Sequence, residues 1–132
     1  MAELVTLLLT ELGGAPAELE AVAQDVLAKE DRTAGFLALD EGRAVGVIML
    51  SEGCAIFARG VFGQITELYV RPDLRSAGIA GRLLAQAVAY GRERGWRRID
   101  VGAPRQPDWA RTVSFYKSNG FIEVGPRLKL TL

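Results

Sequence analysis

The segment from residue 65 to residue 88 constrains the fold of this chain most strongly. Ile65 to Val70 is rich in β-forming residues, and Arg71-Pro72 closes the run. After a short loop, apolar residues recur at helical spacing, at Ile79, Leu83, Leu84, Ala87 and Val88. A strand that leads into an amphipathic helix in this way favours a domain that combines helices with a sheet.

Patterns elsewhere extend this prediction to four helices and about six strands. Helices are expected at 5–12, 16–27, 78–94 and 108–119. The second helix has Pro16 at its first position and an apolar stripe at Leu19, Val22, Ala23, Val26 and Leu27. Strands are expected at 33–39, 44–50, 65–70, 99–101, 121–124 and 127–132, with a turn at 40–43 and a bent, extended stretch at 51–63. This order predicts one α/β (α+β) domain, residues 1–132, with a mixed sheet.

The length and composition are those of an ordinary globular domain. The chain has 132 residues, 49% of them apolar and 24% charged, so it can bury a core without a disulfide or a metal. No apolar run is long enough to cross a bilayer, and the first residues lack the basic start of a signal peptide. The single cysteine, Cys54, cannot form an internal disulfide. We therefore expect a cytoplasmic protein that does not enter a membrane.

The chain contains no histidine, and this excludes several classes of enzyme. Ser-His-Asp hydrolysis, Cys-His thiol catalysis and histidine-ligated metal sites all require that residue. One cysteine also cannot build a cysteine-rich zinc site. We therefore expect no metal, and proton transfer must use Asp, Glu, Tyr, Lys, Cys or water.

Charge and small residues favour an anionic ligand at the start of the helix that follows Val70. Residues 1–66 carry a net charge of −6 and residues 67–132 carry +6, and thirteen of the sixteen basic residues are arginines. Small side chains let a phosphate approach the N–H groups of a helix N-terminus, and arginine binds phosphate in a fork. The structural alternatives are a tightly packed helix start and a solvated basic face. The sequence has no stripe of basic and aromatic residues, so we do not expect nucleic acid as a partner.

Two motifs resemble those of the GNAT superfamily of acyl-CoA-dependent N-acyltransferases. The family pattern Gln/Arg-x-x-Gly-x-Gly/Ala is matched by residues 75–80, Arg-Ser-Ala-Gly-Ile-Ala. The family's Phe-Tyr-x-x-x-Gly-Phe is matched by residues 115–121. The resemblance covers roughly residues 33–125. It implies a GNAT-like mixed sheet that lacks the usual first strand, because a helical pattern opens the chain.

The resemblance implies acetyl-CoA as the co-substrate. Backbone groups of Leu68, Tyr69 and Val70 would pair with the pantetheine arm as a neighbouring strand would. The N–H groups of the following turn would bind the pyrophosphate, which gives the set Arg75, Ser76, Ala77, Gly78, Ile79, Ala80 and Gly81. The thioester would lie where the strands that end at Val70 and Val101 part.

Two candidate catalytic residues follow, Tyr116 and Glu67. Tyr116 resembles the family's proton donor to the departing thiolate, and a phenol with a pKa of about 10 is protonated at neutral pH. The alternative is a tyrosine that only packs in the core. Strand alternation predicts Ile65, Glu67 and Tyr69 on one face, where a lone acid needs a polar cavity or a partner. Glu67 would accept a proton, hold a cationic acceptor, or pair with a structural arginine.

The predicted function is transfer of the acetyl group of acetyl-CoA directly to a primary amine of a small molecule or peptide. Acidic residues in the first half of the chain, Glu52 among them, favour a cationic acceptor. Tyr69 either lines the acceptor pocket or fills the core, and Trp96 is expected to pack. The alternative function is a GNAT fold that binds acyl-CoA without turnover. The resemblance is also compatible with a homodimer.

Overall fold

The computed structural model describes residues 16–75, 77–102, 110–125 and 127–132, with the backbone alone for 16–20. The chain forms two compact units, Met1–Val101 and Gly102–Leu132, and each is described by itself. The helix predicted at 5–12, together with Ser76, Asp108 and Trp109, lies outside the described residues. No helix in the described part of the chain is long and apolar enough to cross a membrane.

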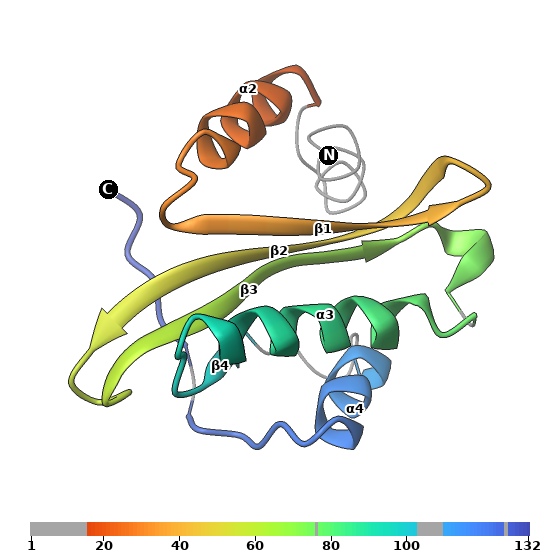
Figure 1. Cartoon of the computed structure of the whole chain (residues 1–132). Helices are drawn as coiled ribbons and strands as arrows, with labels where there is room; N and C mark the ends of the chain where they lie inside the picture. Colours follow the sequence, from red (N-terminus) through yellow and green to blue (C-terminus); the bar gives the residue numbers. More distant parts are fainter. Residues whose placement is uncertain (1–15, 76, 103–109, 126) are drawn as a thin grey trace. The chain divides into compact units, whose positions relative to one another are not determined.

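A four-stranded sheet organises the first unit (Figure 1). Its strands are β1 (Thr33–Asp40), β2 (Arg43–Ala55), β3 (Gly60–Val70) and β4 (Ile99–Val101). β1, β2 and β3 pair in antiparallel order, and β4 pairs with β3 in parallel. The turn at residues 40–43 was predicted, and Glu41 and Gly42 have the positive φ angles, 51° and 79°, that such a tight turn requires. The mixed sheet is confirmed.

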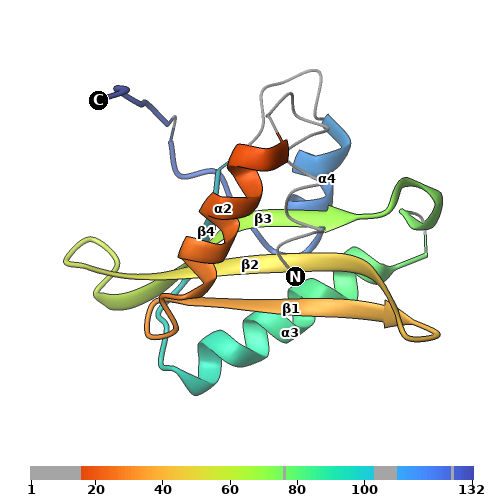
Figure 2. The same cartoon turned by 90° about the horizontal axis from the view of Figure 1, so that it is seen from above.

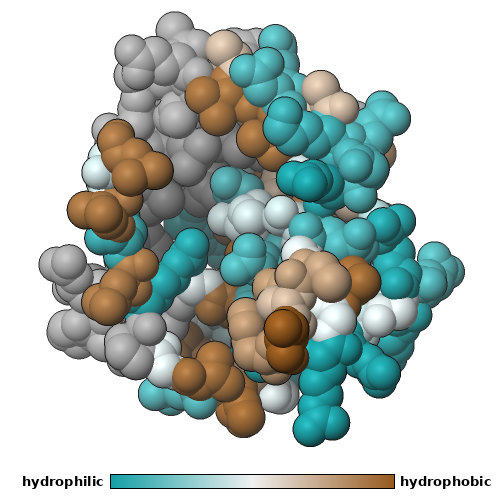
Figure 3. All heavy atoms as spheres, turned by 90° about the vertical axis from the view of Figure 1, so that its left-hand side faces the viewer, coloured by the Kyte–Doolittle hydropathy of each residue, from teal (hydrophilic) through white to brown (hydrophobic). Residues whose placement is uncertain are grey.

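The stretch at 51–63 is the hairpin that joins β2 to β3. Both strands extend further than the pattern predicted, because Ser51 to Ala55 find cross-strand partners between Gly60 and Gln64. At the hairpin tip Ile56 is 99% exposed, while the Arg98 guanidinium lies 4.8 Å from the centre of the Phe57 ring. Figure 3 looks onto this side of the molecule and shows apolar side chains in brown among hydrophilic ones in teal.

The two faces of the sheet are covered by different helices, α2 (Pro16–Leu27) and α3 (Ile79–Glu93) (Figures 1 and 2). Ala23 of α2 packs into a buried cluster with Val47, Met49 and Tyr69. The predicted stripe of α2 is only partly buried, since Val22 is 55% exposed and Val26 is 37% exposed.

α3 packs on the other face, and four of its five predicted apolar residues are buried, while Val88 is half-buried. Ile79, Leu83, Leu84 and Ala87 are buried, together with Gly91. A Cβ at Gly46 of β2 would lie 3.2 Å from side-chain carbons of Ile79 and Leu83. Glycine at this position therefore lets the helix lie close to the strand.

The second unit contains α4 (Ala110–Ser118), which buries Val113 and Tyr116 as the sequence predicted. The two closing strands predicted at 121–124 and 127–132 are wrong, because the described residues there pair with no strand. Their alternating apolar residues remain exposed: Ile122, Val124, Leu128, Leu130 and Leu132. Alternation supplies one apolar face, but a strand also needs a partner for its backbone N–H and C=O groups. The described part of the chain thus has four strands rather than six.

Candidate functional site

The edge of β3 beyond β4 is the first element of the site. β4 pairs only with Gly63, Gln64 and Ile65, whereas β3 continues to Val70. Among the described residues, no strand pairs with residues 66–70 on that side. The strands ending at Val70 and Val101 therefore part after Ile65, and within the described ranges a length of the β3 edge has no strand partner.

The hydrogen bonds that flank this edge show which backbone groups face outward. The Arg71 N–H donates to the Val45 carbonyl oxygen at 2.8 Å, so Arg71 faces β2. Backbone polar groups alternate in direction along a strand, which turns those of Tyr69 toward β2 and those of Leu68 and Val70 away from it. The outward Val70 carbonyl accepts a hydrogen bond from Arg75 Nε at 2.9 Å. Of the three residues predicted to pair with pantetheine, Leu68 and Val70 thus present their backbone to the open edge.

The turn after β3 supplies the second element. A 3₁₀ turn, η1 (Pro72–Leu74), leads to Gly78, which caps α3 with a positive φ of 79°. A side chain is strained at that angle, so glycine is required by the backbone. A Cβ built on Gly78 or on Gly81 meets no heavy atom within 4 Å. Among the described residues the start of α3 is therefore open at these two glycines, and the packed alternative does not apply to them.

The N–H groups in the turn fall into two sets. Ala77 N–H donates to the Leu74 carbonyl at 3.1 Å, and Arg75 N–H donates to the Pro72 carbonyl at 3.5 Å. The first turn of α3 closes when Arg82 N–H donates to the Gly78 carbonyl at 3.3 Å. The N–H groups of residues 79–81 precede that bond and have no intrahelical partner by helix geometry. These N–H groups are therefore suitable donors to an anion, whereas those of Arg75 and Ala77 already donate within the turn.

Glu67 lies on the α2 face of β3, half-buried beside the open edge. Its cross-strand partner is Met49, and the next pair is Leu50 with Ile65, so Thr66 is the additional residue of a β-bulge. The predicted alternation is therefore wrong for Ile65, which shares the other face with Leu50. The Thr66 hydroxyl donates to Glu67 Oε2. No arginine in the described part of the chain forms an ion pair with Glu67.

Tyr116 belongs to the second unit, where it is only 7% exposed. Its ring contacts Phe115 and Phe121 in edge-on arrangements, with ring centres 5.3 Å and 5.2 Å apart. Burial raises the pKa of the Tyr116 hydroxyl to about 12. The phenol is thus fully protonated near neutral pH, as a proton donor must be.

Comparison with known proteins identifies the family. The sequence pattern of the Acetyltransferase (GNAT) family matches residues 2–121. The chain belongs to the GNAT family. It is 32% identical over 93 residues to an uncharacterised N-acetyltransferase of Archaeoglobus fulgidus, which covers 70% of this chain and 62% of that protein. This GNAT chain therefore spans less than two thirds of that archaeal relative.

Solved structures share the fold of this GNAT chain. One is a ribosomal-protein-alanine N-acetyltransferase from Brucella melitensis biovar Abortus 2308, with a TM-score of 0.75 and 21% identity over 98% of this chain and 91% of that one. Another is an aminoglycoside 6'-N-acetyltransferase from Acinetobacter haemolyticus, with a TM-score of 0.75 and 18% identity over 91% of this chain and 83% of that one. At these identities the likeness concerns the fold alone.

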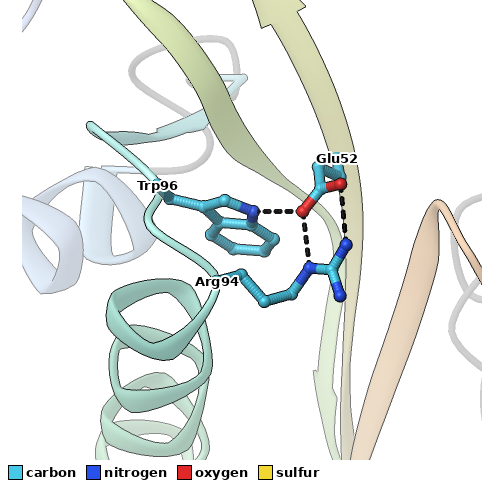
Figure 4. Close-up of polar contacts among 3 residues, drawn as sticks. All are labelled: Glu52, Arg94 and Trp96. Atoms are coloured by element: carbon cyan, nitrogen blue, oxygen red, sulfur yellow. Dashed lines mark hydrogen bonds and ion pairs between the residues drawn. The ribbon is translucent and has the colours of Figure 1, made fainter.

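Glu52 is not free to attract a cationic acceptor in this GNAT chain. Its carboxylate accepts hydrogen bonds from Arg94 Nε at 2.6 Å, from Arg94 Nη2 at 2.9 Å and from Trp96 Nε1 at 2.6 Å (Figure 4). The hydrogen bond from Arg94 lowers the pKa of Glu52 from 4.5 to about 2, against the opposing effect of burial, and the Trp96 N–H adds to the lowering. The sequence did not reveal this cluster, because Glu52 lies more than 40 residues from Arg94 and Trp96.

Tyr69, which the sequence left open, is part of the core, and Trp96 packs as predicted. Tyr69 is 6% exposed and belongs to the buried cluster under α2. The Trp96 indole lies where Gly63 and Gly91 leave room for it, and its ring centre is 5.4 Å from that of Tyr90. Within the described ranges, no group of three or more Asp, Glu or Cys side chains is placed to hold a metal ion.

Proposed function

We propose that this GNAT acetyltransferase transfers the acetyl group of acetyl-CoA directly to a primary amine of a small molecule or peptide. One observation carries the proposal: the open edge of β3 at residues 66–70 runs into an open, small-residue start of α3. An extended polar arm that ends in a pyrophosphate fits such an edge followed by such a helix N-terminus.

The binding residues follow from this arrangement. The backbone groups of Leu68 and Val70 would pair with the pantetheine arm, beside Tyr69. The N–H groups of Ile79, Ala80 and Gly81 would bind the pyrophosphate, and Gly78 gives it room. Arg75, Ser76 and Ala77 precede the helix in the sequence and belong to the proposed binding set, and Arg75 adds positive charge. A β3 N–H that faces the open edge is a suitable donor to the thioester oxygen as that oxygen gains negative charge.

Glu67 and Tyr116 are the two groups that we assign to proton transfer. During the reaction the bond between acyl carbon and sulfur breaks and a bond from the amine nitrogen to the acyl carbon forms. The amine loses a proton, which Glu67 accepts directly or through water, or Glu67 holds the cationic amine in place. Tyr116 donates a proton to the departing thiolate, because its phenol is protonated near neutral pH.

The acceptor is proposed to be cationic because of Glu67 rather than Glu52. The Glu67 carboxylate lacks an ion-pair partner among the described residues, whereas Glu52 is engaged by Arg94. The names of the two structural neighbours point to a protein alanine and an aminoglycoside, and both classes are included in the test. We also propose that residues 1–132 act as one domain, since the family pattern matches both units.

The proposal is tested by two measurements on the full chain. Titration calorimetry with acetyl-CoA and with CoA measures cofactor binding. A thiol-release assay on aminoglycosides, polyamines and alanine-started peptides, with mass spectrometry of the products, measures transfer. Binding together with an acetylated amine supports the proposal. Binding without thiol release on any amine would assign the alternative, an acyl-CoA-binding module without turnover, and no binding would overturn both.

A further inference from the structure

The bulge in β3 decides which face of the sheet carries the Glu67 carboxylate. Residues opposite one another in an antiparallel pair share a face, so Glu67 lies with Met49, and Ile65 lies with Leu50. If Thr66 were a regular residue of the strand rather than a bulge, strict alternation would place Glu67 on the face of Ile65, against α3. Thr66 therefore shifts the carboxylate to the α2 face. Bulges commonly re-aim a side chain in this way near functional sites.

Thr66 also contacts the Glu67 carboxylate directly through its hydroxyl. The Thr66 Oγ1 lies within hydrogen-bond distance of Glu67 Oε2 and 3.4 Å from the Met49 carbonyl oxygen. A threonine hydroxyl has a single proton, and an ionised carboxylate is a stronger acceptor than a carbonyl. The proton therefore belongs on the bond to Glu67.

We propose that Thr66 is a positioning residue for the acceptor amine, acting through Glu67. Its hydroxyl occupies Oε2 and fixes the carboxylate plane, which leaves Oε1 as the oxygen that meets the amine or its proton. This inference rests on the proposed function, because it needs Glu67 to act on the acceptor. The β-branched side chain of Thr66 suits a strand as well, so a purely structural role is the competing explanation.

Thr66→Val separates the two explanations, because it keeps the shape and β-branching and removes only the hydroxyl. We expect kcat/KM for the amine to fall about 10-fold, the scale of a lost hydrogen bond to a charged group. The loss appears in kcat if Glu67 accepts the proton and in KM for the amine if Glu67 holds a cation. Thr66→Ser retains the hydroxyl and should recover most of the activity, and Thr66→Ala repeats the test if the valine variant does not fold.

A double-mutant cycle with Glu67→Gln supplies the decisive comparison. If Thr66 acts through the carboxylate, Thr66→Val has little further effect once Glu67 is glutamine. Thr33→Val is the matched control, because it removes a hydroxyl that bonds to Val26 and Lys29 carbonyls away from the site, and it should leave both kinetic constants unchanged. The affinity for acetyl-CoA should not change in any of these variants.

The outcomes distinguish this inference from the proposed function. An inactive wild-type chain would overturn the proposed function itself. An active chain in which Thr66→Val keeps its kinetic constants, or loses the same factor in both Glu67 backgrounds, would overturn the role of Thr66 alone. Loss in the valine variant with recovery in the serine variant and coupling to Glu67 supports it.

Discussion

The Tyr116 hydroxyl is held in its neutral, protonated form by the structure. Burial raises its pKa to about 12, because the phenolate would be poorly solvated beside Phe115 and Phe121. The neutral phenol is therefore the dominant form from neutral pH well into the alkaline range. An alkaline loss of activity within that range would come from another group or from the substrate.

Replacement of Tyr116 by phenylalanine tests this role. Like Thr66→Val, this substitution removes only a hydroxyl. The ring and its aromatic contacts remain, so the variant should fold. We expect kcat to fall about 10²-fold or more with little change in CoA affinity. The loss should shrink with an acyl donor whose thiol has a lower pKa, since a better leaving group needs less protonation. Near-wild-type turnover of the phenylalanine variant would assign Tyr116 to packing.

Glu67 is tested by Glu67→Gln, which keeps the shape of the side chain and removes its charge. If Glu67 is the general base, kcat should fall about 10²- to 10⁴-fold. If it holds a cationic acceptor, the main effect should be a higher KM for the amine. Steady-state kinetics with the best acceptor of the panel provide the measurement. If kcat and KM for the amine do not change, Glu67 has only a structural role.

At the scale of elements, the junction of β3 with α3 is where the anion should bind. Gly78→Glu places bulk and negative charge beside the N–H groups of residues 79–81, so CoA binding should be abolished. Gly95→Glu is the matched control: Gly95 follows the other end of α3, has a φ of 76° against 79° at Gly78, and is equally open. The two variants share the same backbone strain, and only the first should lose CoA in calorimetry.

A folded Gly78→Glu variant that binds CoA as the wild type does would show that the phosphate lies elsewhere. Equal loss of binding in both variants would indicate a general effect of strain on the fold. Circular dichroism and thermal melting of the two proteins separate that case from a local effect.

At the scale of the molecule, Glu52 links β2 to the segment between α3 and β4. Its pKa is lower in the folded state, so the stability that it contributes is present above about pH 4.5 and is lost as the pH falls toward 2. Glu52→Gln should lower the free energy of unfolding measurably at pH 7, although solvent exposure of the pair limits the size of the change. The difference from wild type should fade in denaturant titrations below pH 4.

Glu123→Gln is the control for this prediction. Glu123 pairs with Lys117 at 2.7 Å, but both side chains are more than half exposed. Exposed pairs contribute little to stability, so this variant should unfold as the wild type does. An equal change in both variants would mean that the Glu52 cluster is no more than a surface ion pair.

The sequence by itself determined the local parts of this protein. The alternating and helical periodicities predicted β1, the hairpin turn, α3 and the buried residues of α4, because these depend on neighbours along the chain. The lack of histidine excluded whole classes of chemistry without any structure. The helix was predicted to begin at Gly78, and the positive φ of Gly78 explains why glycine stands at that position.

Only the tertiary structure decided the features that depend on partners far away in the sequence. The bulge at Thr66 arises from the register of β3 against β2, and it moved Ile65 to the face opposite Glu67. The sequence placed Glu52 among the acids that favour a cationic acceptor, but in the fold its carboxylate is bonded to Arg94 and Trp96. The segments after α4 alternate like strands yet find no partner among the described residues. Periodicity reports what a residue can do locally, whereas register, pairing and burial are set by which surfaces meet.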